Sequence, residues 1–260
     1  MSEYFITADA LRSKQTVIDV HLCRPDGLDA VLETLTDVQQ ATVAAHGFSG
    51  GSGQIVLVPD AKGRTACVLF GTGEVNDGYS DSALQVGILS EKLEAGIYVV
   101  KSAPADWDKS LIAAAWGLGA YRFDRYLGES KPRPTLVLDG DMRPSETVAL
   151  VRATHLGRDL INTPASDMGP ADLEAACRHL AKVHGAKIDV ITGKALIDQN
   201  FPMIHAVGRA AAQDPRLVDM RWGTSGPKLT LVGKGVCFDT GGLNLKPGAS
   251  MGLMKKGSER

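Results

Sequence analysis

The chain has 260 residues, of which 44% are hydrophobic, 22% charged and 5% aromatic, and its formal net charge is −2. This length is ample for two domains, or one large one, with buried cores. The near-neutral charge, with no basic block, argues against nucleic acid as the main partner, and no apolar run approaches the roughly 18 residues of a membrane span.

The cysteines and the N-terminus indicate the compartment. Cys23, Cys67, Cys177 and Cys237 form no C-x-x-C pair, and each lies among apolar residues. We therefore expect buried free thiols, which fit a reducing compartment. The first ten residues, MSEYFITADA, lack the basic and apolar regions of a secretory signal. We expect a cytoplasmic protein without a membrane partner.

The first half of the chain alternates predicted strands and helices. Alternation of Val and Leu with polar residues predicts a strand at 16–23, and short apolar runs closed by Pro or Gly predict strands at 54–60 and 65–73. Further strands are predicted at 96–102 and 134–140. Helices are predicted between them, at 27–45, at 80–93 with Ser80 or Asp81 as a cap, and at 105–123. This alternation favours an α/β fold with a sheet of parallel strands.

A domain boundary is expected within 128–146, where prolines, glycines and charged residues gather. We place it after residue 140, which gives an N-terminal α/β domain at 1–140 and a second domain at 141–260.

The second domain also reads as α/β. One helix is predicted at 146–162 with Ser145 as its cap. The next begins at Pro170, carries apolar residues at helical spacing and ends at Gly185. A short helix follows at 194–200, and strands are predicted at 187–193, 216–222 and 228–235.

Two kinds of candidate site are weak. The loop GFSGGSG at 47–53 lacks the Lys-Ser/Thr pair of a phosphate-binding loop and precedes a strand, so we interpret it as a plain loop. A nucleotide or anion binder that uses the glycine loops is a minor alternative. The histidines form no metal-binding pair. The residues GFSGG at 47–51 have the Gly-x-Ser-x-Gly spacing of serine hydrolases, but they precede a predicted strand instead of following one, so a serine hydrolase is also a weak interpretation.

The stretch LVGKGVCFDTGGLNLKP at 231–247 carries the most suggestive chemistry. Lys234 follows a predicted buried strand, where desolvation lowers the pKa of an amine and can free its lone pair for a metal. Asp239 supplies an oxygen ligand, and Lys246 can face an oxyanion. A glycine-rich turn with one Lys–Asp ion pair is the alternative, and the spacing alone leaves both open.

This loop belongs to a longer match. The segment VGKGVCFDTGGLNLKPGASMGLMKK at 232–256 resembles the signature region of the leucine aminopeptidase (cytosol aminopeptidase) family. Further similar segments are GAYRFDRY at 119–126, GRDLINTPASDMGPADL at 157–173 and FPMIHAVGRAA at 201–211. The resemblance implies a small N-terminal α/β domain followed by the first part of a mixed-sheet α/β catalytic domain like that of zinc peptidases.

The same resemblance implies an activity and its residues. The family releases N-terminal amino acids, leucine-type above all, from peptides by means of two divalent metal ions, manganese or zinc. Lys234 and Asp239 resemble metal ligands, Lys246 resembles the catalytic lysine that polarises the scissile carbonyl, and Met254 resembles a substrate-pocket residue. The resemblance also implies a homo-oligomer, typically a hexamer.

The sequence departs from the family after Lys256. Gly257 stands where the family has a metal-binding aspartate, and the later motif Asn-Thr-Asp-Ala-Glu-Gly-Arg is missing. We therefore expect a truncated chain whose catalytic domain, at 141–260, is incomplete and inactive alone. The alternative is a non-catalytic binding or assembly protein built on the N-terminal domain.

Overall fold

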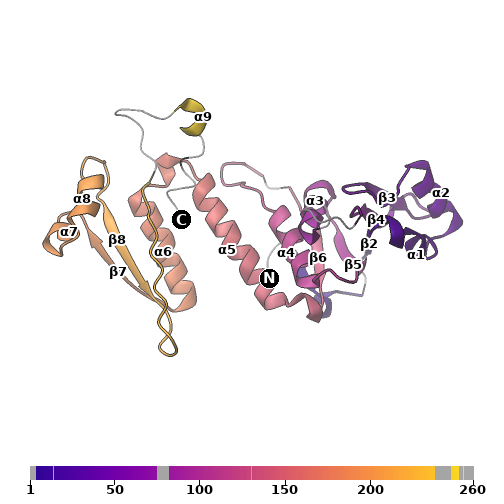
Figure 1. Ribbon diagram of the computed structural model, residues 1–260, viewed down its shortest axis with the longest axis horizontal. Helices are drawn as coiled ribbons and strands as arrows, with labels where there is room; N and C mark the ends of the chain where they lie inside the picture. Colours follow the sequence, from indigo (N-terminus) through magenta and orange to yellow (C-terminus); the bar gives the residue numbers. More distant parts are fainter. Residues whose placement is uncertain are drawn as a thin grey trace. The chain divides into compact units, whose positions relative to one another are not determined.

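The computed structural model describes residues 4–13, 15–74, 82–129, 131–237, 247–251 and 254. The chain forms two compact units, Met1–His155 and Leu156–Arg260 (Figure 1). Helix α5 (Pro144–Asn162) continues through the division. The expected boundary after residue 140 stays a prediction. In the described part of the chain no helix is both long enough and apolar enough to cross a bilayer.

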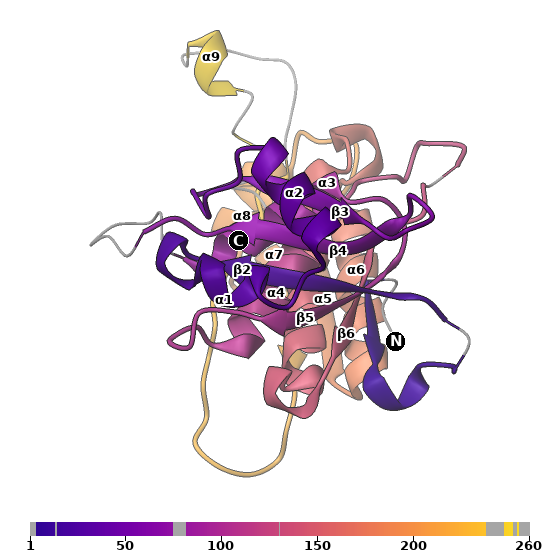
Figure 2. The same cartoon turned by 90° about the vertical axis from the view of Figure 1, so that its right-hand side faces the viewer.

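A six-stranded sheet forms the centre of the first unit, in the order β1-β6-β5-β2-β4-β3 (Figures 1 and 2). All neighbouring strands are parallel except β3 and β4, which are antiparallel. The predicted α/β class with a largely parallel sheet is confirmed. The strands are β1 (Phe5–Thr7), β2 (Val17–Cys23), β3 (Ile55–Pro59), β4 (Thr65–Gly71), β5 (Ile97–Ser102) and β6 (Thr135–Leu138).

Helices cover both faces of this sheet, as Figure 1 shows. On one face, α3 (Gly87–Lys92), α4 (Lys109–Gly119) and the start of α5 pack over a core that includes Val68 and Phe70 of β4. On the other, α1 (Leu28–Leu32) and α2 (Asp37–Ala45) pack over a smaller core that includes Cys67 and Leu69. Successive residues of β4 thus enter opposite cores, as the pleat of a strand requires.

The predicted helix at 27–45 is wrong in its continuity, because α1 and α2 are separate. Thr34 Oγ1 donates to the Val31 carbonyl at the end of α1, with an O···O distance of 2.7 Å. The Gln39 side chain accepts from the Thr36 backbone N–H at 3.0 Å and starts a new helix. A threonine at the start of a helix with Gln three residues later is a capping box. Here it begins a second helix, so residues 27–45 do not form one continuous helix.

Other helix ends also differ from expectation. The cap of the helix predicted at 80–93 is Ser82, whose Oγ accepts from Leu84 N–H at 3.3 Å, while Ser80 and Asp81 lie outside the described residues. Ser145 is not a cap, since α5 begins at Pro144 after Arg143 in the left-handed region at φ 44°. Short 3₁₀ turns complete the unit, at η1 (Ala8–Ala10), η2 (Pro25–Gly27), η3 (Ala83–Val86) and η4 (Gly140–Met142).

The second unit contains η5 (Ala165–Asp167), α6 (Pro170–His184), β7 (Lys187–Thr192), α7 (Ala195–Asp198), α8 (Pro202–Gly208), β8 (Arg216–Arg221) and α9 (Gly248–Met251). Helix α6 is confirmed with both ends, because Pro170 is its first residue and Gly185 follows it at φ 65°. β7 and β8 form an antiparallel pair. Glu174 of α6 forms ion pairs with Arg178 and with Arg216 of β8, which ties helix to sheet.

The strand predicted at 228–235 is wrong. These residues have no regular structure, and Leu229, Leu231 and Val232 are 81%, 84% and 93% exposed. In the described part of the second unit β7 and β8 pair only with each other. An isolated apolar segment cannot satisfy its backbone groups as a buried strand without a neighbour.

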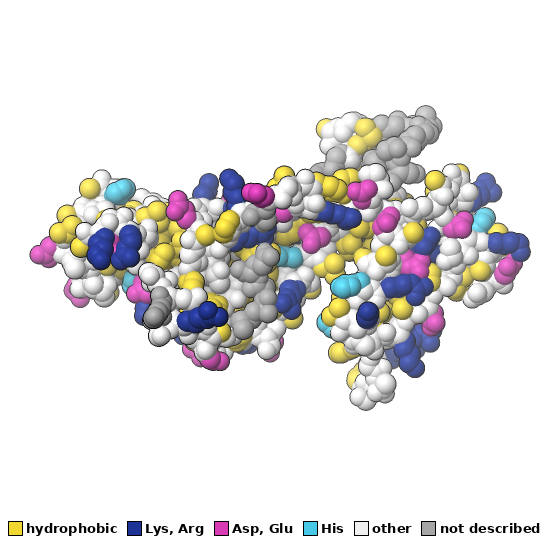
Figure 3. Space-filling view, turned by 180° about the vertical axis from the view of Figure 1, so that it is seen from behind, with side chains coloured by type: hydrophobic (Ala, Val, Ile, Leu, Met, Phe, Trp, Pro, Cys, Tyr) yellow, Lys and Arg dark blue, Asp and Glu magenta, His cyan; other side chains and the backbone are white. Residues whose placement is uncertain are grey.

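Charged side chains of both signs are spread over the surface. Figure 3 shows Lys and Arg interspersed with Asp and Glu over one face of the described residues. This distribution matches the small formal charge of the chain.

Replacement of Gly119 by Ala is expected to destabilise the first unit. An added Cβ would collide with the backbone carbonyl of Gly87, where α4 approaches α3 backbone to backbone. Overpacking of this kind costs about 1–3 kcal/mol, so the urea midpoint should fall. Gly157→Ala in α5 is the control, because nothing lies within 4 Å of its added Cβ. An equal loss of unfolding free energy in the control would contradict the prediction.

Candidate functional site

The structure describes two of the four predicted site residues. Lys234 is exposed and lies in the irregular segment after β8. Met254 is half-buried after α9, with its backbone N–H donating to the Met251 carbonyl at 3.0 Å. Asp239 and Lys246 lie outside the described residues. The proximity of these four side chains stays a prediction.

Lys234 is not desolvated by a buried strand in this structure, because the segment before it is exposed. Within the described ranges no three His, Cys, Asp or Glu side chains gather as a metal site would require. The described residues therefore do not fit a metal pair by themselves, and the ligand roles of Lys234 and Asp239 rest on the motif.

The glycine loop at 47–53 is held by a neighbouring side chain. Gln54 Oε1 accepts from the backbone N–H groups of Ser49 and Gly51, at 2.9 and 3.0 Å. Gly53 N–H donates to the Gly71 carbonyl at 2.9 Å. Backbone amides that a bound phosphate would need are thus already occupied, which weakens the alternative of an anion site in this loop.

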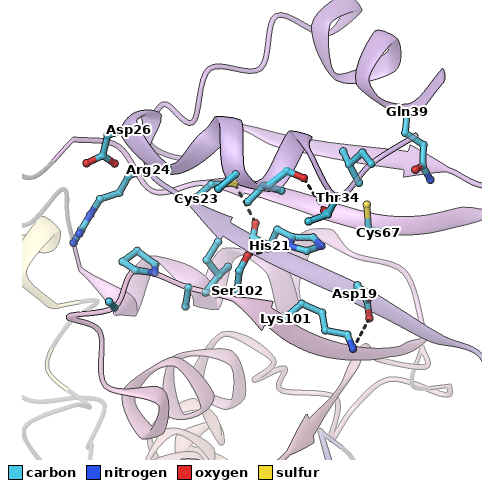
Figure 4. Close-up of a pocket in the computed structure, with 18 of the residues that line it drawn as sticks. Asp19, His21, Cys23, Arg24, Asp26, Thr34, Gln39, Cys67, Lys101 and Ser102 are labelled. Carbon is cyan, nitrogen blue, oxygen red and sulfur yellow. Dashed lines mark hydrogen bonds and ion pairs between the residues drawn. The ribbon is translucent and has the colours of Figure 1, made fainter. Parts of the chain in front are cut away.

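A groove of about 800 Å³ lies within the first unit, and we call it the sheet groove (Figure 4). Strands β2, β4 and β5 form its floor, and α1 and the loops after β2 and β5 form its walls. It is lined by Asp19, His21, Leu22, Cys23, Arg24, Asp26, Gly27, Ala30, Val31, Thr34, Leu35, Gln39, Ala66, Cys67, Lys101, Ser102, Ala103, Pro104 and Ala105.

A bulge between β2 and β5 concentrates polar side chains on this floor. Val20 pairs with Val100, but His21 pairs with Ser102, so Lys101 is an extra residue on β5. A bulge redirects the side chains next to it. As a result, the consecutive residues Lys101 and Ser102 both line the groove, whereas a regular strand would turn them to opposite faces.

The polar groups of the groove contact one another in pairs. His21 Nδ1 and Ser102 Oγ are 2.9 Å apart, and Lys101 Nζ lies 3.9 Å from Asp19 Oδ1. At the end of β2, Arg24 donates two hydrogen bonds to the Asp106 carboxylate, at 2.7 and 2.8 Å. Figure 4 shows Arg24 and the Asp19–Lys101 pair at opposite ends, with His21 and Ser102 between them.

Burial keeps the centre of the groove uncharged. It raises the pKa of Cys23 to about 12 and that of Cys67 to about 11, so both thiols stay protonated at neutral pH. It lowers the pKa of His21, against the opposing effect of Asp19 and with a smaller contribution from Lys101. The groove therefore offers neutral imidazole, hydroxyl and thiol groups between charged ends.

The groove was not predicted from the sequence, in which His21 stands out only as one of several histidines without a metal-binding partner. The segment VIDVHLC at 17–23 does carry a signal, since Asp19, His21 and Cys23 alternate with apolar residues and must share one face. Lys101 and Ser102 of β5 both reach the groove because of the bulge, and no pattern of residues in the sequence predicts a bulge there.

Two family models match the chain. The N-terminal domain of M17 aminopeptidases matches residues 18–139, and the catalytic domain of the cytosol aminopeptidase family matches residues 155–258. A probable cytosol aminopeptidase of Streptomyces griseus is 31% identical over 266 residues, covering 88% of this chain and 51% of that protein. One of Corynebacterium glutamicum is 37% identical over 158 residues, covering 55% of this chain and 31% of that protein.

Solved structures agree in fold. The cytosol aminopeptidase of Coxiella burnetii has a TM-score of 0.81 at 38% identity, covering 94% of this chain and 53% of that one. The bottromycin maturation enzyme BotP in complex with Mn has a TM-score of 0.71 at 28% identity, covering 90% of this chain and 50% of that one. The chain spans about half the length of these relatives.

We expect His21 to titrate in NMR with a midpoint below the ordinary histidine value of about 6.5. Because Lys101 lowers this pKa and Asp19 raises it, Lys101→Gln should raise the midpoint and Asp19→Asn should lower it further. Since folding depresses the pKa, the associated stability is present above about pH 6.5 and is lost as pH falls through the folded value.

The control is Lys109→Gln, which removes a charge whose ion-pair partner, Asp141, lies outside the groove. This variant should leave the His21 midpoint unchanged. A His21 midpoint at or above 6.5, or an equal response to the control, would show that the groove does not set this titration.

Proposed function

Because the chain belongs to the leucine aminopeptidase (cytosol aminopeptidase) family, we propose that it forms part of an aminopeptidase that releases N-terminal amino acids from peptides. The match of residues 155–258 to the family's catalytic domain carries this proposal, since it contains the lysine-rich loop at 232–256. The relation also favours leucine-type N-terminal residues, a cytoplasmic location and assembly into a homo-oligomer, a hexamer in the family.

The proposed site residues are those of the motif. Lys234 and Asp239 ligate the metal ions, and Lys246 holds its ammonium group against the carbonyl oxygen as negative charge develops there. Met254 offers an apolar contact to the N-terminal side chain. Two divalent ions, when bound, supply an activated water and a Lewis acid. The BotP complex with Mn supports manganese as one candidate, with zinc as the other.

We also propose that this chain is inactive alone. Gly257 stands where the family has a carboxylate ligand, and the described residues contain no cluster of three metal-binding groups. A catalytic metal site keeps about three protein ligands. The part of its relatives that this chain does not span is the natural source of the remaining ligands.

A second candidate function is a non-catalytic binding or assembly module. It is favoured by the contrast between the units: the first has a six-stranded sheet with a core on each face, whereas the described second unit leaves Leu229, Leu231 and Val232 exposed. On this hypothesis the first unit carries the binding or assembly function.

A chimaera separates the two candidates. In this chimaera, residues 1–256 of the chain are fused to the remaining C-terminal part of the C. burnetii enzyme. Its hydrolysis of leucine p-nitroanilide is then measured in the presence of manganese. We expect turnover by the chimaera and none by the chain alone. Lys246→Ala should lower kcat by about 100- to 1,000-fold, as for loss of an oxyanion donor. Lys234→Ala should raise the manganese requirement by more than the roughly 10- to 100-fold of an outer-shell change.

Lys228→Ala is the matched control, because Lys228 is an exposed lysine of the same segment outside the motif. It should leave kcat and the manganese requirement unchanged. Turnover by the chain alone would contradict its proposed inactivity. A folded, monodisperse chimaera that binds manganese but hydrolyses no leucyl amide would favour the non-catalytic candidate.

A further inference from the structure

The sheet groove opens where the chain reverses direction across the sheet. After β2 the chain passes to α1 on one face, and after the neighbouring parallel strand β5 it passes to α4 on the other. A crevice forms between the carboxyl ends of two such strands, and open α/β sheets bind their ligands there. The mouth of the groove, from Arg24 to Gly27 and from Ala103 to Ala105, occupies this position.

The two ends of the groove carry available charges of opposite sign. Asp26 is exposed and forms no ion pair or hydrogen bond in the part of the chain that the structure describes. At the other end Lys101 is 53% exposed, and its Nζ lies 3.9 Å from Asp19 Oδ1, a distance too long for a hydrogen bond. Arg24 already donates two hydrogen bonds to the Asp106 carboxylate, so it is less available to a ligand.

The lining excludes a polyanionic nucleotide. The described lining residues have two acidic and two basic side chains, namely Asp19, Asp26, Arg24 and Lys101, so their formal charges cancel. No Phe, Tyr or Trp is among them to stack on a base. The walls between the charged ends include Val31, Leu35 and Pro104, which suit aliphatic side chains.

We propose that the sheet groove binds a short aliphatic peptide as a zwitterion, with its α-ammonium at Asp26 and its α-carboxylate at Lys101. The neutral His21–Ser102 pair lies between these ends and hydrogen-bonds the peptide backbone. Lys101 stands beside the Val20–His21 step of β2, and Asp26 lies three residues beyond the strand's end. The Lys101 ammonium lies beside Asp19, seven residues before Asp26, so the two charged ends are on the order of 20 Å apart, the length of about six extended residues.

This site is distinct from the proposed catalytic loop. The lining residues that the structure describes all belong to the first unit, and neither Lys234 nor Met254 is among them. The groove therefore gives the protein a second way to hold a peptide, one that needs no metal and breaks no bond.

Calorimetry on the full chain tests the proposal, with the hexapeptide Leu-Ala-Ala-Ala-Ala-Leu as the probe and a chelator to prevent hydrolysis. We expect saturable 1:1 binding, and NMR shifts at backbone amides of 19–26 and 101–105. N-acetylation or C-amidation of the probe should each weaken binding about tenfold, the expected effect of losing one charge-assisted hydrogen bond.

Paired variants assign each end of the peptide. Asp26→Asn should weaken the free peptide about tenfold and leave the N-acetylated peptide unchanged, because the lost partner is then already missing. Lys101→Gln should behave in the same way toward the C-amidated peptide. The control pair is Asp141→Asn and Lys109→Gln, an exposed ion pair outside the groove that should not affect binding.

Several results would overturn the proposal. Binding that blocked and free peptides share equally would exclude recognition of the charged ends. Shifts confined to residues outside the groove would place the peptide elsewhere, and an Asp26→Asn effect that persists with the N-acetylated peptide would exclude the assigned orientation. Unaltered spectra and no heat at millimolar peptide would exclude the site, whatever the chimaera does with leucyl amides.

Discussion

The arrangement of the first unit depends on the burial of β4 on both faces. Val68, Leu69 and Phe70 are each fully buried, yet Val68 and Phe70 enter one core while Leu69 enters the other. Since side chains alternate along a strand, a shift of one residue would exchange every contact between the two cores. The register of β4 therefore fixes the positions of β2 and β3 beside it and of the helices above and below.

The two helical layers do not extend equally across this sheet, and the sheet groove follows from that difference. The core beneath α1 and α2 draws on β2, β3 and β4 and contains no residue of β5, whereas the opposite core includes Tyr98 of β5. On the α1 side, β5 consequently presents Lys101 and Ser102 to a cleft instead of to a helix. The bulge opposite His21 increases the effect by turning two consecutive side chains the same way.

Those features of the fold that depend on local sequence patterns could be predicted from the sequence. The strands of the first unit, except the short β1, and the ends of α6 follow from apolar runs and from Pro170 and Gly185. The order of the strands, the bulge on β5 and the groove depend on contacts between segments far apart in the chain, which no local pattern records. The site residues came from a motif and not from spacing, which is why Lys234 could be named while its surroundings were wrongly predicted.

The predicted strand at 228–235 is not formed, and this bears on the proposed metal site because Lys234 lies within the same segment. Burying side chains such as Leu229, Leu231 and Val232 contributes about 1.5–3 kcal/mol each, and the described unit does not gain this energy because they are exposed. A neighbouring strand would supply it, and would also fix the backbone that carries Lys234 directly afterwards. Metal ligands are rarely preformed before their segment folds. We therefore expect pairing of this apolar segment and formation of the proposed metal site to be one coupled event.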